Sequence, residues 1–184
     1  MMNYTNPTTI ISGGACSRLL NPRPAVLVTC IDQSGKPNAI SVAWHTSLSH
    51  EPPLVGISIG LTRYSHELIT STGEYVINVV GQDMQPAVEF CGEHSGRDCD
   101  KIPQAGLQLR PARFLKTPIL EAALGHLECQ VEQEVPAGDH TFFVAKVLHA
   151  EVRSDCFDKA WVPGSGDVLL FLRHNHYGRF VYGE

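Results

Sequence analysis

Two hydroxyls and a guanidinium stand just before a predicted helix, in the segment Leu61-Thr62-Arg63-Tyr64-Ser65-His66. We expect Ser65 to cap this helix and Gly73 to end it. A helix N-terminus offers free amide donors and partial positive charge, and an arginine adds forked, charge-assisted hydrogen bonds. Thr62, Arg63 and Ser65 therefore suit a phosphate monoester, although a plain helix cap beside a surface arginine has the same pattern.

A second polar segment, Ser95-Gly96-Arg97-Asp98-Cys99-Asp100-Lys101, supplies a hydroxyl at Ser95, close backbone approach at Gly96, and two cations. These groups could complete an anion site or form an ordinary solvated loop.

The segment Asn38-Ala39-Ile40-Ser41-Val42-Ala43-Trp44 is predicted to be a strand whose small residues let a flat ring lie near the backbone. Trp44 could flank such a ring, while Asn38 and Ser41 carry groups able to meet its edge. The alternative is a core tryptophan with polar residues on an exposed face.

The turn Gly138-Asp139-His140-Thr141 places an imidazole where a tight turn enters a strand. His140 could stabilise negative charge on a neighbouring group, or it could simply hold the turn together.

The elements that must position these groups are mostly strands. A turn at Asp32 to Lys36 joins the first two strands, and Pro86 is placed at the start of a second short helix. Residues 126–135 alternate, with Leu127, Cys129 and Val131 on one face and Glu128, Gln130 and Glu132 on the other. The predicted strands are Ala25 to Ile31, Asn38 to Trp44, Pro53 to Gly60, Glu74 to Val80, 126–135, His140 to Val152 (covered on both sides), Val168 to Leu172 and Gly178 to Tyr182, and the second helix is Met84 to Cys91. Many strands, short turns and few helices indicate an antiparallel barrel.

Several classes of function are disfavoured. No G-x-G-x-x-G or G-x-x-x-x-G-K-[ST] motif is present, so neither a Rossmann site nor a P-loop is predicted. The six cysteines form no C-x-x-C pair, and the His174/His176 pair lacks a third ligand by spacing, so we expect no metal. A formal net charge of -5 disfavours nucleic acid.

The beginning of the chain is polar, and the longest apolar stretch, Leu54 to Leu61, is too short to span a bilayer as a helix. We therefore expect a cytoplasmic protein without a membrane segment. No linker or repeat is visible, which predicts a single domain over residues 1–184 with a core of about residues 20–182.

The four chemistry-bearing segments, read in order, resemble the flavin reductase-like family of FMN-binding split barrels, with flavoredoxins as near kin. The resemblance rests on N-A-I-S-V-A-W, S-I-G-L-T-R-Y-S-H-E-L-I, C-G-x-x-S-G-R-D-x-D-K and G-D-H-T, and it covers about residues 25 to 181. It implies a mainly β, antiparallel, Greek-key-like split barrel with short helices. It also implies a homodimer with one non-covalent FMN in each subunit.

The resemblance also implies roles for single residues. Asn38, Ala39, Ser41, Val42 and Trp44 would line the isoalloxazine, and Thr62, Arg63 and Ser65 the phosphate. Ser95, Gly96 and Lys101 would lie at the phosphate or ribityl chain, and His140 at the pyrimidine side of the ring, as the candidate catalytic residue. Tyr177, with Phe171 as the alternative, would supply a C-terminal aromatic contact.

The activity implied is a flavin reductase that takes electrons from NAD(P)H or a redox partner and passes them to free flavin, iron or a partner protein. The alternatives are a flavoredoxin-type electron carrier, or a flavin-binding or delivery protein, without significant NAD(P)H turnover. The roles of Cys91 and Cys99 stay open.

Overall fold

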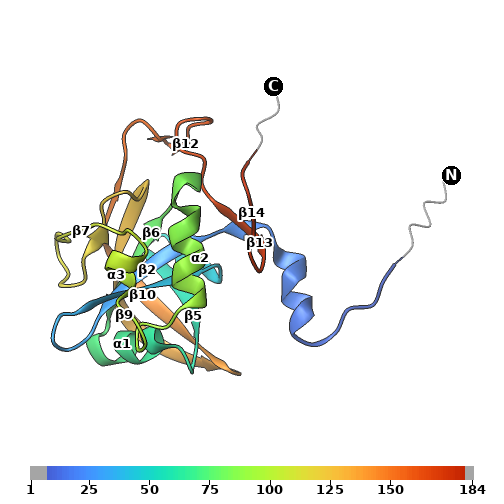
Figure 1. The fold of residues 1–184 in the computed structure, drawn as a ribbon, viewed down its shortest axis with the longest axis horizontal. Coiled ribbons are helices and arrows are strands. Elements are labelled where there is room, and N and C mark those ends of the chain that lie inside the picture. Colours follow the sequence, from blue (N-terminus) through green and yellow to red (C-terminus); the bar gives the residue numbers. More distant parts are fainter. Residues whose placement is uncertain (1–7, 181–184) are drawn as a thin grey trace.

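The computed structural model describes residues 8–180, and its largest element is a seven-stranded antiparallel sheet (Figure 1). The mainly β, antiparallel prediction is confirmed. In spatial order the strands are β3 (Pro37–Val42), β2 (Val26–Ile31), β6 (Glu74–Val79), β9 (Gly125–Ala137), β10 (His140–Val152), β5 (Leu54–Gly60) and β4 (His45–Ser49).

The two edge strands of this sheet, β3 and β4, follow one another directly in the chain. Only Ala43 and Trp44 lie between them. Seven strands laid flat would span about 28 Å from edge to edge, whereas the three peptide units from Val42 to His45 reach at most about 11 Å. The sheet therefore curls into a barrel whose opening lies between β3 and β4.

Strand β3 is covered on both sides. Ile40 and Val42 belong to the core inside the barrel, together with Ile57, Tyr75 and Phe143. Ala39 faces a second core, which β2 and β3 share with two helices on the outside of the barrel, α2 (Gln85–Glu93) and α3 (Lys101–Gln104). This double packing fixes the strand that carries the candidate ring contacts.

Helix α1 (Tyr64–Thr72) begins one residue earlier than the sequence indicated. Arg63 is the N-cap residue, with extended backbone and no side-chain cap bond, so the prediction that Ser65 caps the helix is wrong. Ser65 lies in the first turn and is buried. Gly73 ends the helix in the left-handed conformation at φ 69°, as predicted. Pro86 occupies the first turn of α2, also as predicted.

The central hairpin differs from its prediction in one respect. Strands β9 and β10 are joined by Gly138 and Asp139, as expected. However, β10 is not covered on both sides: in its first half only one face is buried, with Thr141, Phe143 and Ala145, and Lys146 is exposed. The many apolar residues of this strand concealed a period-2 pattern.

Smaller elements surround the barrel. The helix η1 (Gly13–Leu20) was not predicted, has no buried residue and stands away from the body (Figure 1). The expected 173–177 turn is shorter, because β14 already starts at His176, and Val181 and Tyr182 of the expected last strand lie outside the described residues. The remaining elements are η2 (Gln82–Met84) and the strands β1 (Arg23–Pro24), β13 (Leu170–Arg173), β14 (His176–Gly178), β7 (Leu109–Arg110), β8 (Ile119–Leu120), β11 (Phe157–Asp158) and β12 (Ala160–Trp161). Within residues 8–180, no helix has the length and apolar character needed to cross a membrane.

Glu128 was expected on the exposed face of its strand but is only 1% exposed. A loop covers the outer face of β9 there, and its backbone amides at Arg113, Phe114 and Leu115 donate to the Glu128 carboxylate over 2.7, 2.7 and 3.2 Å. The alternating pattern identified the face correctly but could not show that the loop would bury it.

Replacing this carboxylate should destabilise the fold. Glu128→Gln keeps the shape but turns an amide group toward backbone donors, so we expect the free energy of unfolding to fall by about 1.5 to 3 kcal/mol. Urea denaturation measures the change, with Glu132→Gln as the control, because Glu132 lies on the same strand and is exposed. Equal midpoints for the two variants would contradict the prediction.

Candidate functional site

Two adjoining cavities follow β3 along the opening of the barrel, each of about 190 Å³. They share Ile40, Ser41 and Arg63 and so lie side by side, and together we call them the groove. The first cavity is also lined by Thr62, Tyr64, Ser65, Cys91, Gly92, Glu93, His94, Ser95, Gly96 and Lys101. The second is also lined by Val42, Ala43, Trp44, Ser58, Ile59, Gly60 and His140.

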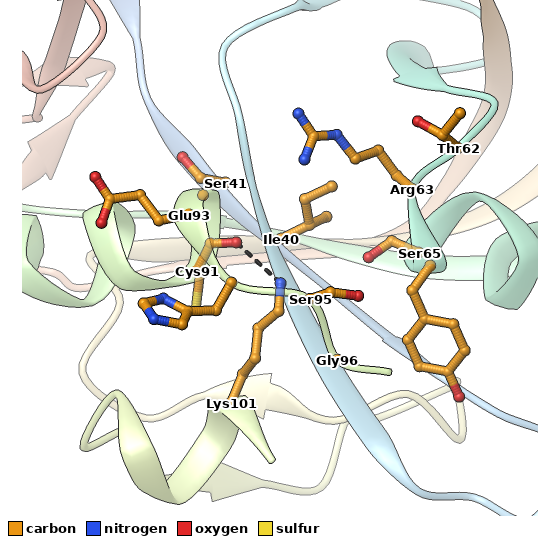
Figure 2. Close-up of a pocket in the computed structure, with 13 residues that line it drawn as sticks. Ile40, Ser41, Thr62, Arg63, Ser65, Cys91, Glu93, Ser95, Gly96 and Lys101 are labelled. Carbon is orange, nitrogen blue, oxygen red and sulfur yellow. Dashed lines mark hydrogen bonds between the residues drawn. The ribbon is translucent and has the colours of Figure 1, made fainter. Parts of the chain in front are cut away.

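Lys101 places a buried ammonium at the floor of the first cavity. The side chain is 4% exposed, and its Nζ donates to the carbonyl oxygens of Ala39 (2.8 Å) and Cys91 (2.9 Å) (Figure 2). Burial lowers the pKa of Lys101. An ammonium has three donors, so one N–H is left for the cavity. These two bonds also tie the start of α3 to β3 and α2.

Arg63 joins the two cavities from the start of α1, and its side chain is drawn on the opposite side of the first cavity from Glu93 (Figure 2). Within the described residues, its guanidinium has neither a hydrogen bond nor an ion pair. The hydroxyls of Ser41, Ser65 and Ser95 line the same space. This end of the groove therefore presents cations and neutral donors together.

Arg97 was predicted, with Lys101, as a cation of a possible anion site, but its side chain instead holds the 95–100 loop in place. Its guanidinium donates to the Thr62 carbonyl (3.2 Å), forms an ion pair with Glu67 (2.8 Å) and lies 5.0 Å from the centre of the Tyr64 ring. Arg97 thus attaches the 95–100 loop to α1 and keeps Ser95 and Gly96 at the cavity wall.

The second cavity has aromatic walls. Trp44 is 39% exposed, which excludes the core-tryptophan alternative, and its ring stacks on that of His140 with centroids 4.9 Å apart. His140 Nδ1 lies 2.6 Å from Asp139 Oδ1, and this hydrogen bond lowers the pKa of Asp139. Because Nδ1–H points to Asp139, Nε2 is the nitrogen that remains for the groove.

Asn38 and Ala39 lie beneath the groove rather than in its wall. Asn38 is 4% exposed, and its Nδ2 donates to Ser65 Oγ over 2.8 Å. Ala39 faces the helix-side core and contributes only its carbonyl, to Lys101. The strand was predicted correctly, but Asn38, which was expected along the ring, lines neither cavity.

The C-terminal aromatics lie apart from the groove in this chain. Tyr177 and Phe171 pack against each other, with ring centroids 5.9 Å apart, and neither lines the two cavities. Burial raises the pKa of Tyr177, and Glu89 and Glu93 add to the effect.

Sequence reasoning missed part of the lining. Cys91 lines the first cavity, and burial raises the pKa of its thiol to about 11, so it is protonated at neutral pH. Cys99 only donates to the Ser95 carbonyl over 3.5 Å. Ser58, Ile59 and Gly60 line the second cavity because β5 extends beyond its pairing with β4, a relation that no local motif reveals.

Comparison with known proteins identifies the family of this chain. A family model described as the flavin reductase like domain matches residues 17–179. A flavin reductase from Pseudomonas putida is 30% identical over 160 residues, covering 87% of this chain and 84% of the relative.

Solved structures give the same picture. A flavoredoxin from Methanosarcina acetivorans superposes with a TM-score of 0.86 at 22% identity, covering 97% of this chain and 94% of that one. An FMN-binding protein from Thermus thermophilus gives 0.81 at 26% identity, with both chains fully covered.

The fold and the groove together define a protein of the split-barrel class. Within that class, the chain belongs to the flavin reductase-like family, as its four motifs had indicated.

Proposed function

We propose that this chain binds FMN without a covalent bond and is an NAD(P)H-dependent flavin reductase. The observation that carries the proposal is the chemical difference between the two ends of the groove. One end offers Arg63, Lys101 and serine hydroxyls, and the other has a strand edge and two stacked rings. FMN has a phosphate at one end and a flat ring system at the other.

The donor set fits a phosphate. Among the described residues, Lys101 and Arg63 have no carboxylate partner, so an anion would meet two available cations. The one carboxylate that lines the first cavity, Glu93, accepts a hydrogen bond from Asn175 over 2.9 Å. The name of the FMN-binding relative from Thermus thermophilus supports the same ligand.

Bound FMN would supply the two-electron redox chemistry. The chain's own residues would bind and orient it: Arg63, Ser65 and Lys101 at the phosphate, with Thr62, Ser95 and Gly96 around it, and Ser41, Val42 and Trp44 along the ring. Trp44 would exclude water from one side. His140 would hold a proton at Nε2, close to where negative charge develops.

Electrons would come from NAD(P)H or a redox partner and pass to free flavin, iron or a partner protein. The names of the flavin reductase relatives support a nicotinamide donor.

We also propose that the active form is a homodimer. Trp44, Leu48 and Leu61 are 39%, 43% and 53% exposed around the opening of the barrel, and a second copy of the chain would cover apolar surface there. Because Tyr177 lies apart from the groove in its own chain, we propose that the second copy supplies the aromatic contact to the ring. The six free cysteines fit a reducing compartment, which supports a cytoplasmic location. A single domain over residues 1–184 stays our prediction.

The decisive experiment is the visible spectrum of the purified protein, before and after anaerobic addition of NADH and of NADPH. We expect a yellow protein that releases FMN, not FAD, on denaturation and is bleached by at least one nicotinamide. A colourless protein that also fails to take up FMN would refute the proposal. Stable binding without bleaching would instead indicate an electron carrier or a flavin-delivery protein.

Arg63→Met should weaken FMN much more than riboflavin, because only FMN carries the phosphate. Loss of one charge-assisted bond corresponds to roughly 1.5 to 3 kcal/mol, or about 10- to 100-fold in Kd. Quenching of flavin fluorescence measures both constants. Arg110→Met is the matched control, since Arg110 pairs with Glu151 and lines neither cavity. Equal losses for the two ligands would place the phosphate elsewhere.

His140→Gln should lower the midpoint potential of the bound flavin while leaving FMN affinity nearly unchanged. Glutamine can keep a hydrogen bond but cannot become charged. A decrease of about 30 mV for a two-electron couple corresponds to roughly 1.4 kcal/mol. Identical potentials for parent and variant at every pH would show that His140 only stabilises its turn.

A further inference from the structure

Asn38 makes an unusual set of contacts for a buried amide. One face of its carboxamide meets Ser65, where Nδ2 donates to Oγ over 2.8 Å, and the same nitrogen lies 3.7 Å from Cys30 Sγ. Its Oδ1 is buried without any hydrogen-bond partner. A buried amide oxygen without a hydrogen-bond partner lowers the stability of the fold. A hydrophobic residue would avoid that cost, so the amide needs a reason beyond folding.

Gly96 leaves room for this amide because it has no side chain. A Cβ on Gly96 would lie 2.2 Å from Asn38 Oδ1, closer than any real contact, whereas the backbone of Gly96 does not adopt a positive φ. The glycine is therefore required for close approach and not for backbone conformation. It lets the 95–100 loop, which forms a wall of the first cavity, lie directly on Asn38.

The hydrogen bond from Asn38 orients the hydroxyl of Ser65. Its hydroxyl is 2% exposed, lines the first cavity and accepts the hydrogen bond from Asn38. A hydroxyl has one proton, and an oxygen that already accepts from an amide directs that proton elsewhere. Cys30 Sγ, which also lies within hydrogen-bond reach of Ser65, is a weak acceptor. A phosphate oxygen in the cavity would be a much stronger one.

We propose that Asn38 is a positioning residue of the phosphate site: its amide orients Ser65 so that the hydroxyl proton is donated to an oxygen of the FMN phosphate. This inference rests on the function proposed above and deepens it, because it makes selectivity for FMN over riboflavin depend on a residue that touches no ligand. Gly96 is part of the same arrangement, because its lack of a side chain lets the 95–100 loop pack against the amide.

The test is a double-mutant cycle between Asn38→Leu and Ser65→Ala, with dissociation constants measured for FMN and for riboflavin by fluorescence quenching. Ser65→Ala should weaken FMN by about 10-fold or more and riboflavin by less than about 2-fold. Asn38→Leu should show the same selectivity. In the Ser65→Ala background, Asn38→Leu should have no further effect on FMN, because the residue acts through that hydroxyl.

Two further variants keep the test decisive. Gly96→Ala displaces the amide without altering Asn38 and should give the same selective loss, which remains informative if Asn38→Leu does not fold. Thr29→Val is the matched control: it removes another buried hydroxyl, which donates to the Pro118 carbonyl over 2.6 Å and lines neither cavity. We expect it to lower stability and leave the ratio of the two constants unchanged.

The outcomes are distinct. Additive losses in the cycle, or equal weakening of both ligands by Asn38→Leu and Gly96→Ala, would overturn the positioning role while leaving the proposed FMN site intact. A parent protein that binds FMN no better than riboflavin would overturn the phosphate site and this inference together.

Discussion

The short connection between β3 and β4 is the constraint on which the rest of the structure depends. Because Ala43 and Trp44 alone link the two edges of a seven-stranded sheet, the sheet has to curl until those edges nearly meet. They do not pair with each other. The barrel therefore keeps an opening lined by the free edge of β3, and the connection itself places Trp44 at that opening, where it stacks on His140.

A second consequence concerns the helices outside the barrel. An edge strand with free carbonyls needs donors, and Lys101 supplies one to Ala39 while also reaching the last turn of α2 at Cys91. The same ammonium thus satisfies backbone groups and leaves one N–H for the groove. Lys101→Ala would therefore disturb both the structure and the proposed phosphate contact. Arg63 tests the phosphate contact alone, because its guanidinium has no hydrogen bond or ion pair among residues 8–180.

Local patterns predicted the fold well, since hairpins depend on alternation and on turn residues that are neighbours in sequence. They were less accurate where the burial of a residue depends on a segment that is distant in sequence. Glu128 became buried because a distant loop covers its face, and Ser65 lies inside α1 because that helix begins at Tyr64. Asn38 was expected beside Ser41 along the ring, but alternation puts the two side chains on opposite faces of β3. The motif assigned these residues to one site, which stays a prediction, and only the packing distinguishes the residues that line the groove from those beneath it.

The charge distribution explains how the groove could select an anion on an acidic chain. With a formal net charge of -5, the long-range field of the protein disfavours phosphate, and at physiological salt that field is screened beyond about 8 Å. Selection must therefore come from short, desolvated contacts. Lys101 is suited to this because it is buried and directed by two carbonyls, and Ser65 because Asn38 fixes its hydroxyl. Exposed Arg63 would add a charge-assisted bond to the phosphate, and the buried donors Lys101 and Ser65 would add short, directed bonds.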